Sequence, residues 1–221
     1  MLFPTIIADN FFVDPDEIVN FAKTLKFQPS SDGTWPGTRS AHLHTIDKLL
    51  FCKVNSKILS IIFPSIPNIQ YQCASSFQII KQNTKNNLKQ GWVHFDDPYL
   101  FTAIIYLSKH EDVGTTIVEA KNFNSNIINL SSKIRANLGK DVKNLNGKLY
   151  ENNKQFKDSI VVKSKYNRIL IFDSNQYHYV PNFISNDLSE DRLTLVCFFQ
   201  NIYHENGIRF PIPEMRKNKE I

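Results

Sequence analysis

Two side chains that can bind a metal ion stand two positions apart in the segment Gly91–Pro98, which reads Gly-Trp-Val-His-Phe-Asp-Asp-Pro. On a β-strand, residues two apart point to the same face, so His94 and Asp96 would reach a single cation. One histidine from a distant strand would complete a facial set of two histidines and one carboxylate, which leaves three coordination positions open and is typical of non-haem Fe(II) sites. We expect this third ligand to be His178, which follows the strand-like run Arg168–Asp173.

The choice between two neighbouring carboxylates rests on the same periodicity. Asp97 would point away from His94 and could instead cap the turn at Pro98. Asp96 would share the face of His94. We therefore predict that Asp96 is the carboxylate ligand.

The remaining histidines are weaker candidates for a metal site. His42 and His44 form a second pair, two apart on strand-like sequence, and we interpret them as a polar strand face. His110 lies between Lys109 and Glu111, where a solvated side chain is the better interpretation. His204 comes after the last strand that we expect in the core.

Strand-like runs surround these candidates in a recognisable order. An apolar run follows the His-x-Asp motif, a β-branched run begins with Gly-Thr, and two more runs flank His178: Leu100–Leu107, Gly114–Val118, Arg168–Asp173 and Asp191–Phe199. With these parts in this order, the sequence resembles the 2-oxoglutarate/Fe(II)-dependent oxygenase superfamily, particularly its prolyl-hydroxylase-like branch. That family has an H-x-D strand, a Tyr-Leu-Ser strand, a Gly-Thr strand, a distal histidine and a basic residue one strand later.

The resemblance also implies a site for the co-substrate 2-oxoglutarate. Arg192, fourteen positions after His178, resembles the family's basic anchor for the distal carboxylate. A guanidinium fork matches a carboxylate bidentately and stays charged when it is partly buried. Thr194 would lie on the same strand face, and Tyr106 resembles a family tyrosine that also contacts 2-oxoglutarate. Arg168 is a rival anchor, which we expect to make a structural ion pair instead.

The activity that the resemblance implies is that of a dioxygenase using Fe(II), 2-oxoglutarate and O₂. It would hydroxylate an amino-acid or peptidyl, prolyl-like substrate and release succinate and CO₂. Two alternatives remain: a cupin-like metalloenzyme without 2-oxoglutarate, which would not need a carboxylate anchor at Arg192, and a non-catalytic jelly-roll binding protein.

A turn-rich segment earlier in the chain resembles one that precedes the catalytic core in some bacterial and phage members of this branch. It reads Trp-Pro-Gly-Thr-Arg-Ser over residues 35–40. Trp35 or Arg39 would then face the substrate at the site entrance. The other interpretation is a structured connector whose tryptophan belongs to the core.

The elements that position these residues are helices first and strands later. Residues 3–12 indicate a strand; Asp14 and Asp47 are predicted N-caps of two amphipathic helices, the second ending before Pro64; strand patterns begin at Tyr71. The predicted fold is mainly β with supporting helices, a double-stranded β-helix or jelly roll. We expect one domain over 1–221, with a helical support layer at 1–66, a core at 70–203 and a tail at 204–221. The core contains an insertion at 121–158, which we interpret as a partial lid.

Composition limits the classes of protein to which the chain can belong. At 221 residues with 42% hydrophobic and 21% charged residues, it is typical of a globular domain. No apolar run approaches the roughly 18 residues of a membrane span, and three scattered cysteines indicate no disulfide framework, so we expect a cytoplasmic protein. The net charge of +5 is dispersed, which argues against a nucleic-acid partner. The expected partner is a small-molecule or peptide substrate, and the oligomeric state stays open.

Overall fold

The computed structural model describes residues 4–29, 37–80, 90–109, 111, 114–121, 145–182 and 191–203. Its helices are α1 (Pro15–Lys23), α2 (Leu43–Ile46), α3 (Lys48–Ile62) and α5 (Leu145–Asn153). Its strands are β1 (Ile6–Ala8), β2 (Phe27–Pro29), β3 (Thr38–Ser40), β4 (Gln70–Ile80), β5 (Phe101–Tyr106), β6 (Thr115–Ala120), β7 (Phe156–Val162), β8 (Ile169–Asp173), β9 (His178–Tyr179) and β10 (Arg192–Tyr203). None of these described helices is long and apolar enough to cross a membrane.

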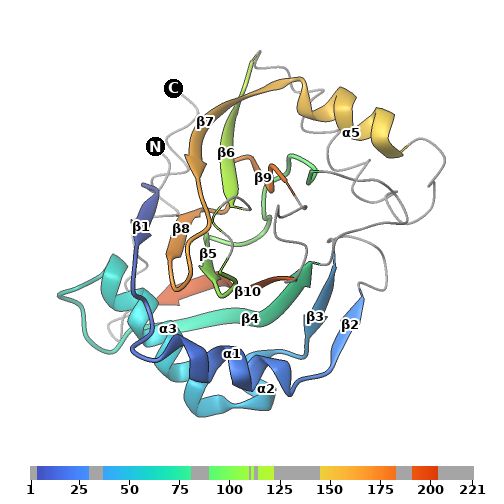
Figure 1. The fold of residues 1–221 in the computed structure, drawn as a ribbon. Coiled ribbons are helices and arrows are strands. Elements are labelled where there is room, and N and C mark those ends of the chain that lie inside the picture. Colours follow the sequence, from blue (N-terminus) through green and yellow to red (C-terminus); the bar gives the residue numbers. More distant parts are fainter. Residues whose placement is uncertain are drawn as a thin grey trace.

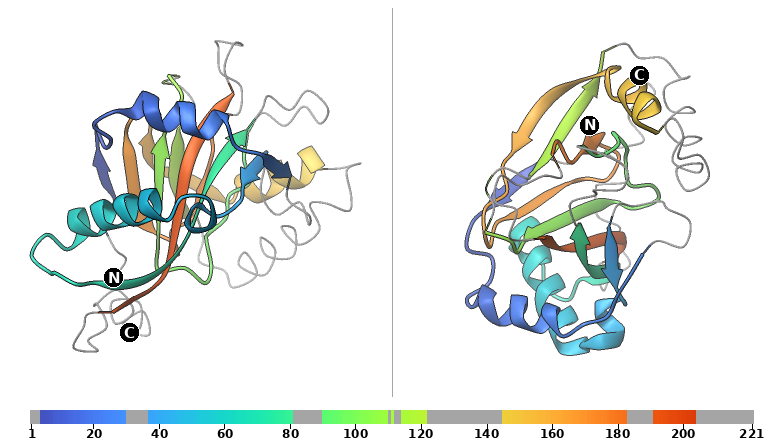
Figure 2. Two further views of the ribbon diagram at one scale, coloured as in Figure 1. Left: turned by 90° about the horizontal axis from the view of Figure 1, so that it is seen from below. Right: turned by 45° about the vertical axis from the view of Figure 1, so that its right-hand side comes forward.

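Two antiparallel sheets lie face to face, and helices cover the outer side of the larger one (Figures 1 and 2). The large sheet has seven strands in the order β1-β8-β5-β10-β4-β3-β2, and the small sheet has three in the order β7-β6-β9. The predicted mainly-β jelly roll with supporting helices is therefore confirmed. The N-terminal third supplies more than helices, because β1, β2 and β3 also join the large sheet.

Two predicted helix starts are confirmed in detail. The Asp14 side chain accepts a hydrogen bond from the Glu17 backbone at 3.0 Å, with Pro15 at the first helical position of α1. The Asp47 side chain accepts from the Leu50 backbone at 2.9 Å at the start of α3. The left view of Figure 2 shows both helices lying against the large sheet, and buried residues of each, such as Ile18 and Ile58, belong to the core cluster there.

The predicted polar strand face at His42 and His44 is wrong, because this segment forms the short helix α2. Leu43 is fully buried and anchors the turn in the core. Thr45 closes the turn by donating from both its backbone nitrogen and its hydroxyl to the His42 carbonyl oxygen, at 2.9 and 2.7 Å. Local side-chain bonding of this kind favours a turn over an extended strand.

Other expected boundaries move by a few residues. The predicted strand at residues 3–12 is only β1, because Asn10 has a left-handed φ of 59° that ends the extended run. The predicted insertion 121–158 contains α5, and β7 already begins at Phe156, inside the expected insertion. Most of the insertion that we interpreted as a lid, residues 122–144, lies outside the described residues.

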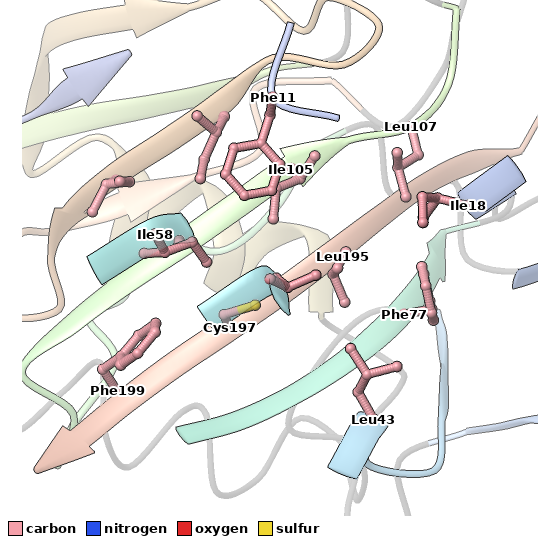
Figure 3. Packing of buried hydrophobic residues seen from close by; sticks show 14 of the residues in the cluster. Phe11, Ile18, Leu43, Ile58, Phe77, Ile105, Leu107, Leu195, Cys197 and Phe199 are labelled. Atoms are coloured by element: carbon pink, nitrogen blue, oxygen red, sulfur yellow. The ribbon is translucent and has the colours of Figure 1, made fainter. Parts of the chain in front are cut away.

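The main core lies between the large sheet and the helices (Figure 3). Alternate residues of β10 point into it, and the rings of Phe101 and Phe199 stack there at 4.3 Å between centroids. The other face of β10 points toward the small sheet. There a second apolar cluster joins the two sheets: Ile104, Tyr106, Ile117, Val162, Leu170, Phe172 and Val196.

Close contact between strands explains the Gly-Thr signature at the start of β6. A side chain at Gly114 would place its Cβ 1.8 Å from the Val162 carbonyl oxygen, a distance that no side chain tolerates. Thr115 and Thr116 then follow as fully buried strand residues. The glycine therefore lets β6 lie against β7.

The edge strand β1 is attached to β8 by side chains as well as by the ladder. Arg168 donates from Nε to Asp9 at 2.6 Å, and Lys165 contacts the same carboxylate at 2.9 Å. The Asn167 side chain donates to the Phe12 carbonyl at 2.8 Å and accepts from the Phe12 backbone nitrogen at 2.7 Å. Arg168 thus makes the structural ion pair that we expected of it.

Candidate metal centre

Three side chains from two distant parts of the chain converge between the sheets. Ligand atoms of His94, Asp96 and His178 all lie within 4.8 Å of one another. The Asp96 carboxylate is 3.7 Å from His94 Nε2 and 3.4 Å from His178 Nε2. Asp96 and His178 are buried, whereas the His94 side chain is 29% exposed, so the cluster can be approached from the His94 side.

The segment with His94 is not the regular strand that we predicted. His94 pairs with His178 in an isolated antiparallel bridge, with backbone bonds of 3.0 and 2.8 Å. Two residues later, the Asp96 nitrogen donates to the Ser174 carbonyl at 2.7 Å, and a turn through Asp97 and Pro98 follows. The extended backbone still brings the side chains at positions 94 and 96 to one cluster.

Backbone carbonyls determine which nitrogen of each imidazole faces the cluster. His94 Nδ1 lies 2.7 Å from the Trp92 carbonyl oxygen, and His178 Nδ1 lies 3.0 Å from the Gln176 carbonyl oxygen. Since a carbonyl oxygen can only accept, each Nδ1 carries the proton in these bonds. Each Nε2 is thereby turned toward Asp96, and a ring with its proton on Nδ1 can offer the lone pair of Nε2 to a metal ion.

The carboxylate is also held by a side chain of the large sheet. Thr102 on β5 donates its hydroxyl to Asp96 Oδ2 at 2.9 Å and contacts the Ser174 hydroxyl at 2.9 Å. Asp97 is exposed and lies outside the cluster. The structure therefore brings the predicted carboxylate, and not its neighbour, to the two histidines. Two imidazole nitrogens and one carboxylate oxygen are a donor set that suits Fe(II).

A second group of polar residues lies at one end of β10. Arg192 is buried, and its guanidinium carbon lies 5.7 Å from the centroid of the Tyr106 ring. Thr194, two residues on, pairs with Tyr106 across the ladder, so the predicted co-substrate residues are neighbours on one face of the sheet. The Tyr106 hydroxyl donates to Thr115 at 2.9 Å.

The electrostatics of this group favour an anion. Burial raises the pKa of Tyr106 and lowers the pKa of Arg192, but an arginine remains charged even when its pKa falls. The Thr194 hydroxyl is buried and finds no hydrogen-bond partner among the described residues. A buried cation beside an unsatisfied hydroxyl fits the distal carboxylate of 2-oxoglutarate, which would accept from both.

Of the two expected entrance residues, Arg39 is described and Trp35 lies outside the described residues. Arg39 on β3 places its guanidinium carbon 5.3 Å from the centroid of the Phe198 ring, and its Nη2 donates to Gln78 Oε1 at 3.3 Å. Phe198 stacks on Tyr99 at 4.9 Å. Phe198 also pairs with Thr102, the residue that holds Asp96. Arg39 thus belongs to an aromatic group next to the metal centre.

Sequence reasoning missed several residues around the site. Phe198 could have been found, because it continues the alternation of Arg192 and Thr194 along β10. Thr102 could have been found in the same way on β5. The sequence has no comparable signal for Tyr99. Two of the weaker histidine candidates, His110 and His204, lie outside the described residues.

Comparisons with known proteins agree with this architecture. A family model described as "Family of unknown function (DUF6445)" matches residues 3–199. No curated protein matches the sequence. Among solved structures, the chain is similar to the non-heme alpha ketoglutarate dependent epimerase SnoN from nogalamycin biosynthesis, with a TM-score of 0.53 and 12% identity over 90% of this chain and 79% of SnoN.

Two further structures are similar to the same extent. HygX from Streptomyces hygroscopicus, solved with nickel, 2-oxoglutarate and hygromycin B, gives a TM-score of 0.54 at 10% identity over 88% of this chain and 82% of HygX. A prolyl hydroxylase from Trichoplax adhaerens, in complex with a hypoxia inducible factor peptide fragment, gives a TM-score of 0.53 at 12% identity over 88% of this chain and 82% of the hydroxylase. At these identities the likeness is one of fold, and it confirms the expected resemblance to 2-oxoglutarate/Fe(II) oxygenases at that level.

Proposed function

Because the chain belongs to DUF6445, a family of unknown function, we propose its activity from its own site: it is a 2-oxoglutarate- and Fe(II)-dependent oxygenase. One observation carries the proposal. The two-histidine, one-carboxylate cluster and the buried Arg192–Thr194 pair occur together between the sheets of one jelly roll. The first would bind the metal and the second the co-substrate.

His94, Asp96 and His178 would hold Fe(II), which with 2-oxoglutarate and O₂ supplies the oxidation of a substrate C–H bond coupled to release of succinate and CO₂. The protein prepares the site by orienting these ligands. The Trp92 and Gln176 carbonyls keep each Nε2 turned toward the cluster, and the Thr102 hydroxyl holds one oxygen of Asp96.

The residues of the large sheet would orient the co-substrate. Arg192 would bind the distal carboxylate, and Thr194 and Tyr106 would lie beside it. Apolar side chains of both sheets, Ile117, Val162 and Val196 among them, form one buried cluster with Tyr106 and would exclude water from this salt bridge. A lowered local dielectric strengthens the attraction between guanidinium and carboxylate.

We place the substrate on the side of Arg39, and retain Trp35 as an expected part of the entrance. An amino-acid or peptidyl, prolyl-like substrate with hydroxylation as the outcome is the proposal. The solved structure of a prolyl hydroxylase with a peptide supports it at the level of fold. The partial exposure of the His94 side chain supports access of a substrate to the metal.

The test is an anaerobic titration of Fe(II)-loaded protein with 2-oxoglutarate, following the visible absorption that appears when the co-substrate binds protein-held Fe(II). Wild type should develop this band and form succinate once O₂ is admitted. His178→Ala and Asp96→Ala should lose both signals, because each removes one of three ligands.

Asp97→Ala is the matched control, since Asp97 is an exposed neighbour outside the cluster. It should behave as wild type. Loss of the band in Asp97→Ala with retention in Asp96→Ala would mean that the wrong carboxylate had been chosen. A folded, iron-loaded wild type without any band would contradict the proposed use of 2-oxoglutarate.

A further inference from the structure

Among the described residues, the segment with His94 has a strand partner on one side only. His94 pairs with His178, and the Gly91 nitrogen donates to the Val180 carbonyl at 2.7 Å, so this side is bonded to β9 and the residue after it. The backbone N–H and C=O of Val93 point to the side opposite β9. In the described part of the chain no strand pairs with that side.

Two asparagines at the end of α5 occupy the place of the missing strand. Asn153 accepts from the Val93 nitrogen with Oδ1 at 3.0 Å and donates from Nδ2 to the Gly91 carbonyl at 2.9 Å. Asn152 donates from Nδ2 to the Val93 carbonyl at 3.2 Å. A primary amide has the donor and acceptor of a peptide group, so Asn153 bonds to two alternate backbone positions as a neighbouring strand would.

The contact is buried and specific. Asn152 has no exposed surface, and Val93 is packed with Val118 and Phe156. The Asn152 Oδ1 atom finds no partner among the described residues. If the Asn152 amide were rotated by 180°, its Oδ1 would face the Val93 carbonyl oxygen, and two acceptors would be in contact. Nδ2 must therefore face Val93, even though Oδ1 is left unsatisfied.

Capping of α5 does not account for these side chains. The main chain and Gln155 already bond the last carbonyls of the helix: Lys154 donates to Tyr150, and Gln155 donates to Asn152 from its backbone and to Glu151 from its side chain. Apart from one bond between the two asparagines, the bonds of their amides go to the segment with His94.

We infer that Asn152 and Asn153 are positioning residues that hold the backbone of Gly91–Val93, and through it the His94 ring, in place for metal binding. The link is short, because Trp92 lies between the two held residues and its carbonyl orients His94 Nδ1 at 2.7 Å. The inference rests on the proposed metal role of His94. It assigns the helix of the insertion a part in the site, although the two asparagines bond to backbone groups and not to the three ligand side chains.

The experiment uses the full chain and Co(II), a spectroscopic substitute for Fe(II) whose binding is followed by visible absorption. Asn153→Ala should lower Co(II) affinity roughly 10- to 100-fold, the usual effect of removing a group that orients a ligand. Hydrogen exchange should show that the Val93 amide has lost its protection. Asn152→Ala removes one bond to this segment, whereas Asn153→Ala removes two, so Asn152→Ala should have a smaller effect in the same direction.

Asn153→Asp serves as the conservative variant if the alanine variant folds poorly. It keeps an acceptor for the Val93 nitrogen but replaces the donor to Gly91, so its Co(II) affinity should lie between wild type and Asn153→Ala. Asn55→Ala is the control for general destabilisation. Asn55 is equally buried, but lies on α3 beside Cys73, across the large sheet.

The outcomes separate the inference from the proposed function. If wild type binds Co(II) and Asn153→Ala binds it equally well, the inference is wrong and the function stands. If Asn55→Ala weakens Co(II) binding as much as Asn153→Ala, the effect is one of global stability and the inference is again overturned. If wild type binds no Co(II), the metal role of His94 fails, and the positioning role fails with it.

Discussion

The large sheet and the edge of the small sheet hold their functional residues by different means. Along β10 the ladder to β4 runs from Arg192–Ile80 to Tyr203–Gln70 with one register shift, and β5 pairs on the other side. The metal cluster instead depends on a two-residue strand and one isolated bridge. There, the side chain of Asn153 makes backbone bonds that a neighbouring strand would otherwise make, and the Thr102 hydroxyl holds the Asp96 carboxylate.

This difference teaches that the two halves of the proposed site have separate supports. The co-substrate group on β10 is part of the most extensively paired strand of the described fold. The metal ligands lie where backbone pairing ends, so their geometry depends on individual hydrogen bonds. A substitution that weakens β10 should therefore leave metal binding unchanged, and one that weakens the hydrogen bonds around the metal ligands should leave the 2-oxoglutarate residues in place.

The largest effect is expected from the core beneath β10. Leu195 is fully buried between the large sheet and the helices. Leu195→Ala should lower the free energy of unfolding by about 2–5 kcal/mol, because it removes buried methyl groups and leaves a cavity. Urea denaturation measures this loss.

The Co(II) affinity of the folded Leu195→Ala protein should stay within about twofold of wild type. A fall of the affinity in step with stability would show that the two supports are not separate.

An intermediate effect is expected at the co-substrate end. Arg192→Ala removes one partner of a buried charge pair, which typically costs about 2–5 kcal/mol, so 2-oxoglutarate affinity should fall roughly 30-fold or more. Calorimetry with the Co(II)-loaded protein measures it. Arg192→Lys should recover only part of the affinity, since an ammonium lacks the bidentate fork.

Co(II) binding by Arg192→Ala should be unchanged. Equal loss of Co(II) and 2-oxoglutarate binding would mean that Arg192 supports the fold rather than the co-substrate.

The smallest effect is expected at the sheet edge formed by β1. Arg168 and Lys165 lower the pKa of Asp9 from 3.8 to about 2 in the folded protein. A carboxyl whose folded pKa is lowered contributes stability above its unfolded pKa and loses it as the pH falls through the folded value. The Asp9 side chain is 31% exposed, so solvent screens the pair and the contribution should be below about 1 kcal/mol.

Asp9→Asn should therefore reduce stability slightly at neutral pH and remove part of its decline between about pH 4 and pH 2. Chemical denaturation across that range measures it. An unchanged pH dependence in the variant would show that the ion pairs contribute nothing measurable.

Much of the fold and the His94–Asp96 part of the metal cluster could be predicted because their signals are local. Asp14 and Asp47 cap helices within one turn, and the alternation along β5 and β10 assigns faces to their residues. His94 and Asp96 share a motif of three residues. Each of these predictions depends on residues that are neighbours in sequence.

What could not be predicted depends on distant partners. Asn153 and Val93 are 60 residues apart, and nothing near Asn153 indicates a backbone on the other side of the site. The strand expected around His94 became a single bridge because its outer side meets side chains rather than a strand. The strand expected at His42 became helical because the burial of Leu43 and the bonds of Thr45 outweighed the local pattern.

The central place of β10 has a consequence for how the protein is made. β10 follows every other described strand in the chain, yet it lies between β5 and β4. As the chain leaves the ribosome, these two strands emerge first and each keeps an unpaired edge until β10 arrives. A ribosome that stalls before Arg192 would release a polypeptide with all three proposed metal ligands but an open sheet. Such a polypeptide is prone to aggregate. Chaperones and proteases would therefore bind it before iron does.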